Sequence, residues 1–226
     1  MDVGRDLIDH RIVDLDGHDV GRVDDVWIYA ADRAAVVSPI VTGTGALLRQ
    51  LGKVGERITQ LAPHVGYRHA DRWREIVWDD VHQLQRPQVV LKPRLRDLAG
   101  RPEGHRPRPG VELLYTDLIR LPVRDPSGRR MGVVDVRTSL PDPEPAIVGL
   151  LVTAHPLRHT LGLKRFDSTS ERFGGAQHHT RYLAWTADLQ MSERAILCPV
   201  PLTNLPLLSA APTSTPPPMP DQPDTP

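Results

Sequence analysis

Residues 6–23 read DLIDHRIVDLDGHDVGRV, and residues 117–134 read DLIRLPVRDPSGRRMGVV. Seven positions are identical in the two stretches, at a constant separation of 111 residues. A period of this length indicates a duplicated small domain, because the units of solenoid proteins are only about 20–50 residues long. The sequence therefore predicts two tandem copies of one fold within the 226 residues.

The similarity between the two copies extends beyond this stretch and indicates β-structure. Residues 35–42 and 146–153 are apolar runs rich in β-branched side chains, which are typical of buried strands. Asp16-Gly17 and Ser127-Gly128 predict hairpin turns ahead of further strands. An Arg-x-x-x-Trp pattern closes each copy, ending at Trp78 and at Trp185. We therefore expect a mainly β protein.

This order of strands and turns resembles the PRC-barrel family, which is similar to the cytoplasmic domain of the photosynthetic reaction-centre H subunit and to the C-terminal domain of a ribosome maturation factor. The resemblance implies an all-β fold of two tandem small barrels, at residues 5–92 and 116–200, that bind other macromolecules and catalyse no reaction. The motif positions are expected to be structural: Asp14, Gly17, Gly21, Val23, Trp78, Asp125, Gly128, Gly132, Val134 and Trp185.

One segment of the first copy has a helical period. Leu47, Leu51, Val54, Ile58 and Leu61 are spaced by four, three, four and three residues, which places them on one face of a helix over residues 46–62. The second copy has no stripe of that length. The stripe is a candidate surface for a protein partner, and the alternative is that this inserted helix caps its own barrel or packs on the second one.

Two segments outside the copies are rich in proline. Residues 93–115 contain Pro and Gly together with basic side chains, and we interpret them as a linker that is a candidate contact for nucleic acid. Its arginines are Arg94, Arg96, Arg101, Arg106 and Arg108. Residues 201–226 are Pro-rich, with only two charged side chains, Asp221 and Asp224, and we expect this tail to be disordered, above all from about residue 209 onward.

Composition excludes several classes of protein. Lys+Arg and Asp+Glu are both 28, so the chain has no net charge that would favour a polyanionic partner. Cys198 is the only cysteine, which rules out an intrachain disulfide. No apolar stretch reaches the ~18 residues of a transmembrane helix, and no signal peptide is recognisable. These features predict a soluble, cytoplasmic protein.

No motif in the chain favours catalysis, a cofactor or a metal. Asp14-x-Asp16-Gly17 fails as a calcium loop, because the spacing of the later ligands is wrong. His155 and His159 are four residues apart and form the one alternative metal pair. Pro156 and Gly162 disfavour the helix that this pair would need, and the first copy has no equivalent histidines. We therefore expect no enzyme activity, no cofactor and no metal.

The interpretation that we favour is a non-catalytic adaptor that binds a protein partner. By family resemblance, this partner belongs to a membrane complex such as a magnesium-transporter-like protein. Two alternatives remain open at this point: an RNA- or ribosome-associated module, and a metal-binding protein that uses His155 and His159.

Deletion of residues 210–226 should leave the melting temperature unchanged, because this tail has no apolar face to bury. Differential scanning calorimetry of the full and shortened chains tests this expectation. A decrease of several degrees would show that the tail packs on the folded part.

Overall fold

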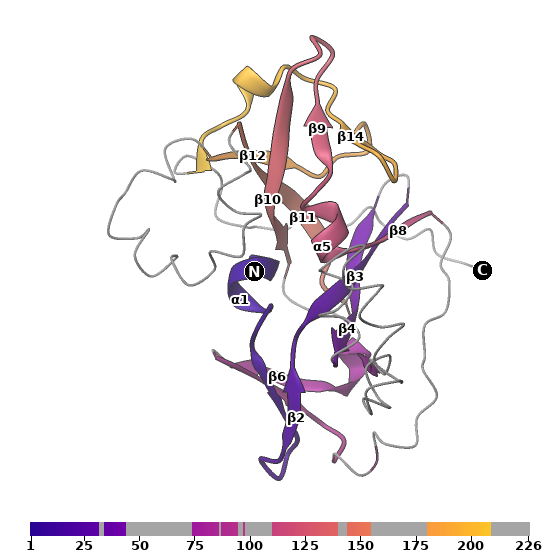
Figure 1. The fold of residues 1–226 in the computed structure, drawn as a ribbon, viewed down its shortest axis with the longest axis vertical. Helices are drawn as coiled ribbons and strands as arrows, with labels where there is room; N and C mark the ends of the chain where they lie inside the picture. Colours follow the sequence, from indigo (N-terminus) through magenta and orange to yellow (C-terminus); the bar gives the residue numbers. More distant parts are fainter. Residues whose placement is uncertain are drawn as a thin grey trace, which may run out of the picture.

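The computed structural model describes residues 1–31, 34–43, 74–85, 87–94, 97, 110–139, 144–154 and 180–208. This part of the chain is mainly β and forms three sheets. Figure 1 shows the strands of the first copy in the lower half of the view and most strands of the second copy in the upper half, with the short helices α1 (Val3–Asp6) and α5 (Tyr115–Leu118) between them. The predicted helix over residues 46–62 lies outside the described residues.

Two four-stranded sheets contain the strands of the first copy. One has the order β2-β1-β7-β6, and its strands are β1 (Arg11–Val13), β2 (Asp19–Arg22), β6 (Val81–Gln85) and β7 (Gln88–Leu91). The other has the order β5-β4-β3-β8, and its strands are β3 (Asp25–Ala30), β4 (Ala35–Thr42), β5 (Arg74–Ile76) and β8 (Val111–Leu114). The predicted linker at 93–115 thus includes a strand, β8, and the first residue of α5.

One six-stranded sheet contains the second copy, in the order β12-β11-β10-β9-β14-β13. Its strands are β9 (Pro122–Arg124), β10 (Arg130–Thr138), β11 (Ile147–Thr153), β12 (Thr180–Ala184), β13 (Gln190–Met191) and β14 (Ile196–Leu197). The apolar runs at 35–42 and 146–153 are therefore strands β4 and β11, as the sequence predicts. Within the described residues none of the three sheets closes into a barrel.

The two copies repeat the same strand pairing. In the first copy β1 pairs antiparallel with β2 and parallel with β7, while β4 lies between β3 and β5. In the second copy β9 pairs antiparallel with β10 and parallel with β14, while β11 lies between β10 and β12. The register repeats as well, because Ile12 faces Val89 as Val123 faces Ile196. The duplication in sequence is thus a duplication of topology.

The hairpin after β1 has the same geometry as the hairpin after β9. Gly17 has φ +82° and Gly128 has φ +80°, a backbone region in which side chains with a Cβ are strained. In each turn the glycine amide donates to the carbonyl of Asp14 or Asp125, at 3.0 and 2.9 Å. The predicted hairpin turns are confirmed. Glycine occurs at the same position of both turns because the backbone there needs a positive φ.

The extra residue of the first copy interrupts a strand. β10 runs unbroken over nine residues, whereas the equivalent stretch is divided into β2 and β3 around Val23 and Asp24. The Asp24 carboxylate accepts a hydrogen bond from the amide of Gly43 at 2.6 Å, across from the break. The sequence predicts a β-bulge here, and the structure shows a break that turns the chain from one sheet into the next.

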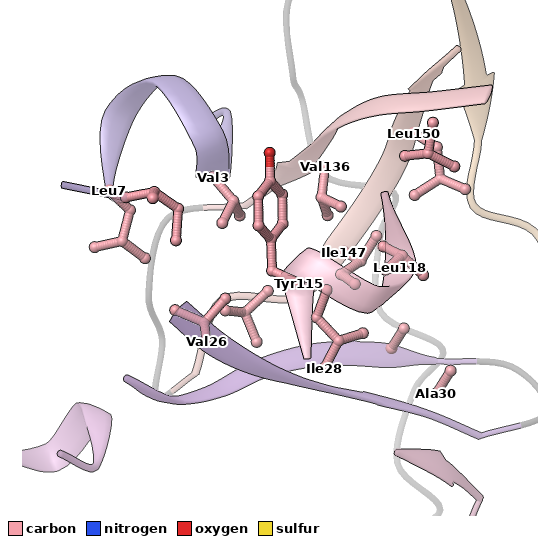
Figure 2. Close-up of a cluster of buried hydrophobic side chains, with 14 of the residues drawn as sticks. Val3, Leu7, Val26, Ile28, Ala30, Tyr115, Leu118, Val136, Ile147 and Leu150 are labelled. Carbon is pink, nitrogen blue, oxygen red and sulfur yellow. The ribbon is translucent and has the colours of Figure 1, made fainter. Parts of the chain in front are cut away.

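The two copies share one hydrophobic core. A single buried cluster includes Ile12, Ile28 and Val89 of the first copy together with Leu150 and Ile196 of the second. Figure 2 shows the centre of this cluster, where side chains from α1, β3, α5, β10 and β11 meet. Strands β4 and β11 also approach each other at their starts, where the Val37 amide donates to the Pro145 carbonyl at 2.9 Å. The copies are therefore packed together as halves of one unit.

The two closing tryptophans differ in their surroundings. Trp78 lies in the 3-10 turn η2 (Trp78–Asp80), is buried, and donates its indole N–H to the carbonyl of Val37. Trp185 is half-buried at the edge of the core, and the equivalent carbonyl, that of Val148, accepts from the Tyr182 hydroxyl at 2.8 Å and from the Trp185 backbone amide at 3.0 Å. Both rings thus pack on the core, but Trp78 is buried and Trp185 only half-buried.

The described residues contain no helix that is both long and apolar enough to cross a bilayer.

Trp78→Phe should lower the free energy of unfolding by about 2–3 kcal/mol, because it leaves a buried void and removes the indole donor to Val37. Trp185→Phe is the matched control and should cost less than about 1 kcal/mol, since its ring is only half-buried. Urea denaturation measures both values. Equal losses would contradict the different burial of the two rings.

Candidate interaction site

The N-terminal segment of each copy packs on the other copy. Asp2 forms a β-bridge with Arg137, the Thr138 amide donates to the Met1 carbonyl at 2.7 Å, and α1 packs on β10. In return, β8 pairs antiparallel with β3, with Leu114 opposite Trp27, and α5 packs on β3. Residues 1–6 on β10 and residues 111–118 on β3 together form what we call the exchange contact.

An aspartate lies at the centre of each half of the exchange contact. Oδ1 of Asp135 accepts hydrogen bonds from the amide of Gly4 at 2.7 Å and from the hydroxyl of Tyr115 at 3.2 Å. The carboxylate of Asp25 accepts the amide of Thr116 at 3.3 Å and its hydroxyl. Each carboxylate also accepts the amide of the residue that follows it, at 2.7 Å from Val136 and 2.9 Å from Val26.

The two aspartates are equivalent positions of the duplication. If Asp24 is taken as the extra residue of the first copy, then Val23-Asp25-Val26 corresponds to Val134-Asp135-Val136. Their donors come from the same stretch of each copy but are one residue out of register, since Gly4 corresponds to Tyr115 and Thr116 corresponds to Arg5 at the separation of 111 residues. The exchange contact therefore has an approximate two-fold symmetry within one chain.

Burial controls the electrostatics of the exchange contact. It raises the pKa of Asp25 to about 6 and that of Asp135 to about 6, although the hydrogen bonds that they accept act in the opposite direction. Burial also raises the pKa of Tyr115 well above its ordinary value, and the nearby Asp135 adds to this shift. The Tyr115 hydroxyl is therefore a stable hydrogen-bond donor to Asp135.

An ion pair closes the outer side of α1. Arg137 Nε lies 2.8 Å from Asp2 Oδ1, and Arg5 Nη2 lies 3.2 Å from Asp2 Oδ2. The hydrogen bond that Arg137 donates to Asp2 raises the pKa of Arg137, so the guanidinium stays charged over the whole physiological range. Because Asp2 is buried with two arginines around it, its charge is compensated within the contact.

Gly4 is required by the closeness of the two segments. A Cβ at this position would lie 2.2 Å from the hydroxyl oxygen of Tyr115 and 3.0 Å from Oδ1 of Asp135. Figure 2 shows the ring of Tyr115 standing between Val3 of α1 and Val136 of β10. The smallest residue thus lies where α1 meets the largest side chain of α5.

Asp14, Asp16 and His18 place three possible metal ligands within 4.8 Å of one another. However, Oδ1 of Asp14 accepts the backbone amides of Asp16 and His18 at 3.0 and 2.8 Å, and Asp16 forms an ion pair with Arg94 at 3.0 Å. These contacts build a turn and engage Asp16 at its tip.

The second copy builds the same turn with different side chains. Asp125 accepts the Ser127 hydroxyl at 2.6 Å and the Arg129 amide at 3.0 Å, and these hydrogen bonds lower its pKa. Since Ser127 and Arg129 replace Asp16 and His18, the two turns share a backbone geometry and not a set of ligands. We therefore assign Asp14 and Asp125 to the turns.

Exposed apolar side chains follow the last strand of the second copy. We call Leu197, Val200 and Leu207, which are 47, 43 and 38% exposed, the apolar strip. The strip crosses the sheet, since Leu197 belongs to β14 and Leu207 forms a β-bridge with Arg181 of β12. No charged residue occurs from Ala195 to Pro220. In the first copy the chain continues after β7 with Lys92-Pro93-Arg94, so the apolar character belongs to the second copy alone.

Specific contacts hold the apolar strip against the second copy. Leu202, in the 3-10 turn η5 (Leu202–Asn204), is buried, and its amide donates to Oδ2 of Asp125 at 2.9 Å. The Arg181 guanidinium donates to the carbonyls of Thr203, at 3.1 Å, and Leu205, and the Tyr182 amide donates to Pro206 at 2.9 Å. Residues 201–208, the start of the predicted tail, are therefore packed on β12 and on the hairpin; from residue 209 onward the tail lies outside the described residues.

Several predicted positions cannot be placed. The helix stripe of Leu47, Leu51, Val54, Ile58 and Leu61 lies outside the described residues, as do the pair His155 and His159 and the arginines Arg96, Arg101, Arg106 and Arg108. Arg94 is described, and it is bound to Asp16. Val23 is fully buried, whereas its counterpart Val134 is half-buried.

The comparisons add no relative to these observations: no protein-family model matches the chain, and no curated protein matches it.

Sequence reasoning missed the exchange contact. The two aspartates could have been found from the sequence, because Val-Asp-Asp-Val and Val-Asp-Val occur at matching positions of the copies. No sequence pattern indicated that residues 1–6 would dock on the second copy, since this pairing joins positions more than 130 residues apart. The predicted motif residues instead mark turns and core positions.

Gly4→Ala should destabilise the protein by about 1–3 kcal/mol, because the new methyl group collides with the Tyr115 hydroxyl. Helix propensity alone would make this substitution stabilising, because it favours Ala over Gly by up to about 1 kcal/mol. The double variant Gly4→Ala/Tyr115→Phe removes the colliding oxygen and should be less destabilised than the sum of the two single changes. Strictly additive losses in urea denaturation would contradict the contact.

Proposed function

We propose that this chain is a non-catalytic interaction protein that binds a protein partner through the apolar strip Leu197, Val200 and Leu207. The observation that carries the proposal is the exposure of these side chains on a segment that is itself firmly anchored. Exposed apolar side chains on a rigid support bury area on binding and lose little conformational entropy. Surfaces of this kind are typical of protein–protein contacts.

The repeated strand pairing supports the further proposal that each copy is a PRC-type barrel. In both copies a parallel pair, β1 with β7 or β9 with β14, joins the first strand to the last. This link between first and last strands is what a small barrel needs in order to close. By family resemblance, the proposed partner is a component of a membrane complex, such as a magnesium-transporter-like protein, that meets this chain in the cytoplasm.

The structure favours this proposal over an RNA-binding role. The one arginine of the predicted basic segment that is described, Arg94, is engaged in an ion pair with Asp16. The chain as a whole has a net charge of zero, and phosphate contacts depend on an excess of Lys and Arg. The apolar strip has no charged residue that would attract a polyanion.

Replacing Leu197 and Val200 by Asp should abolish capture of the partner, since the loss of two central apolar contacts weakens a typical interface at least tenfold. Affinity capture from the native cell with quantitative mass spectrometry identifies the partner of the unaltered chain and measures its loss. The matched control is Leu15→Asp, a 55% exposed leucine at the tip of the first hairpin, which should capture the partner normally.

Circular dichroism must show that all variants are folded. Retention of the partner by the folded Leu197→Asp/Val200→Asp protein would place the interaction elsewhere, and equal loss in the Leu15→Asp control would show an unspecific effect of charge.

A further inference from the structure

Two arginines of the second copy lie directly opposite each other on neighbouring strands. Arg124 of β9 pairs with Arg130 of β10, and opposite residues of an antiparallel pair carry their side chains on the same face. Like charges in this arrangement repel each other. Within the described residues, neither guanidinium has a hydrogen bond or an ion pair, and the Nε–H of Arg124 is buried without an acceptor. We call these two residues the arginine pair.

The carboxylate next to the arginine pair in the sequence is engaged elsewhere. Oδ1 of Asp125 accepts the Ser127 hydroxyl at 2.6 Å and the Arg129 amide at 3.0 Å, and Oδ2 accepts the Leu202 amide at 2.9 Å. Both oxygens therefore serve the hairpin and η5. A buried donor without an acceptor is unfavourable, and a ligand that supplies the acceptor removes this penalty.

The fold does not require arginines at these two positions. In the first copy the equivalent residues are Val13 and Asp19, which face each other across β1 and β2 in the same way. Asp19 is itself compensated, because Arg11 Nε lies 3.1 Å from its Oδ2. The same strand pairing thus forms without two opposed cations. The arginine pair is a property of the second copy alone, as the apolar strip is.

The arginine pair borders the apolar strip. Arg124 lies beside Leu197 in the parallel pairing of β9 with β14, so Arg130, Arg124 and Leu197 form one row across three strands. Figure 1 shows β9 between β10 and β14. Neighbouring strands are about 4.8 Å apart, so a group held between the two arginines would lie about 7 Å from Leu197. Alternate residues of an extended chain are separated by the same distance, since each residue spans about 3.3 Å.

We propose that the arginine pair binds a carboxylate of the protein partner, on an extended segment whose acidic residue lies two positions from the apolar side chain that covers Leu197. This inference rests on the proposed function and adds the chemistry of the segment that binds. A carboxylate between the two guanidinium groups relieves their repulsion and accepts the free Nε–H of Arg124. A free phosphate or a nucleic-acid backbone would satisfy the arginines but has no apolar group for Leu197.

A pair of short peptides tests the proposal on the full chain. The probe is acetyl-Leu-Ala-Glu-Ala-Leu-amide, and the control peptide has Gln in place of Glu. Nuclear magnetic resonance of the ¹⁵N-labelled protein follows the Nε–H signal of Arg124, which is assigned by its loss in Arg124→Gln. The Glu peptide should shift this signal and bind about threefold or more tightly than the Gln peptide. Added salt should reduce this preference, because it screens the charges.

Three variants locate the preference for Glu. Arg124→Gln and Arg130→Gln should each reduce it, and both should stay folded, since neither guanidinium makes a hydrogen bond within the described residues. Leu197→Ala should weaken the binding of both peptides and keep the preference. Arg11→Gln is the matched control, because Arg11 is an exposed arginine on the equivalent sheet of the first copy, and it should change nothing.

Equal binding of the Glu and Gln peptides, or a preference that survives in both Arg124→Gln and Arg130→Gln, would overturn the inference. So would inorganic phosphate that binds at Arg124 more tightly than the Glu peptide at equal ionic strength. These results leave the proposed function intact if Leu197→Asp/Val200→Asp still loses its captured partner. Capture that survives in that variant would instead refute the proposed function, whatever the peptides show.

Discussion

The docking of each copy's N-terminal segment on the other copy is the interaction on which the rest of the structure depends. Without residues 1–6 and 111–118, β10 and β3 would each lose a paired neighbour, and the core around Tyr115 would be open to water. The close approach of Gly4 to Tyr115 makes this docking possible, and Asp135 gives it a polar anchor. The shared core then joins the copies into one unit.

A duplication within one chain suits such an exchange. Two separate copies would lose translational entropy when they associate. Covalent linkage instead keeps the exchanged segments at a high effective concentration. This arrangement tolerates two carboxylates at the centre of the contact, although burial raises the pKa of each to about 6. The same arrangement couples the two halves, because α5 both docks on β3 and places Tyr115 against Asp135.

The sequence best predicted those features that depend on residues close together in the chain. The hairpins at Gly17 and Gly128 and the buried strands β4 and β11 follow from turn chemistry and from apolar runs, and both appear as predicted. The sequence did not predict two strands or the exchange contact. Strand β8 lies in a Pro/Gly-rich stretch, and β6 is largely exposed, so neither shows a clear apolar pattern. The docking of α1 depends on contacts between residues far apart in the sequence. For the helix stripe and for His155 and His159, the sequence interpretation stands untested.

The two-fold symmetry of the core does not extend to the surface. After the equivalent strands β7 and β14 the copies diverge: Arg94 pairs with Asp16, whereas Leu202 is anchored by Asp125 and leaves Leu197 and Val200 exposed. Packing in the shared core keeps β1 and β9 in the same register. It does not constrain the segments that follow β7 and β14. Duplication in one chain thus permits a single apolar strip on a symmetric support, which a dimer of identical repeats would necessarily present twice.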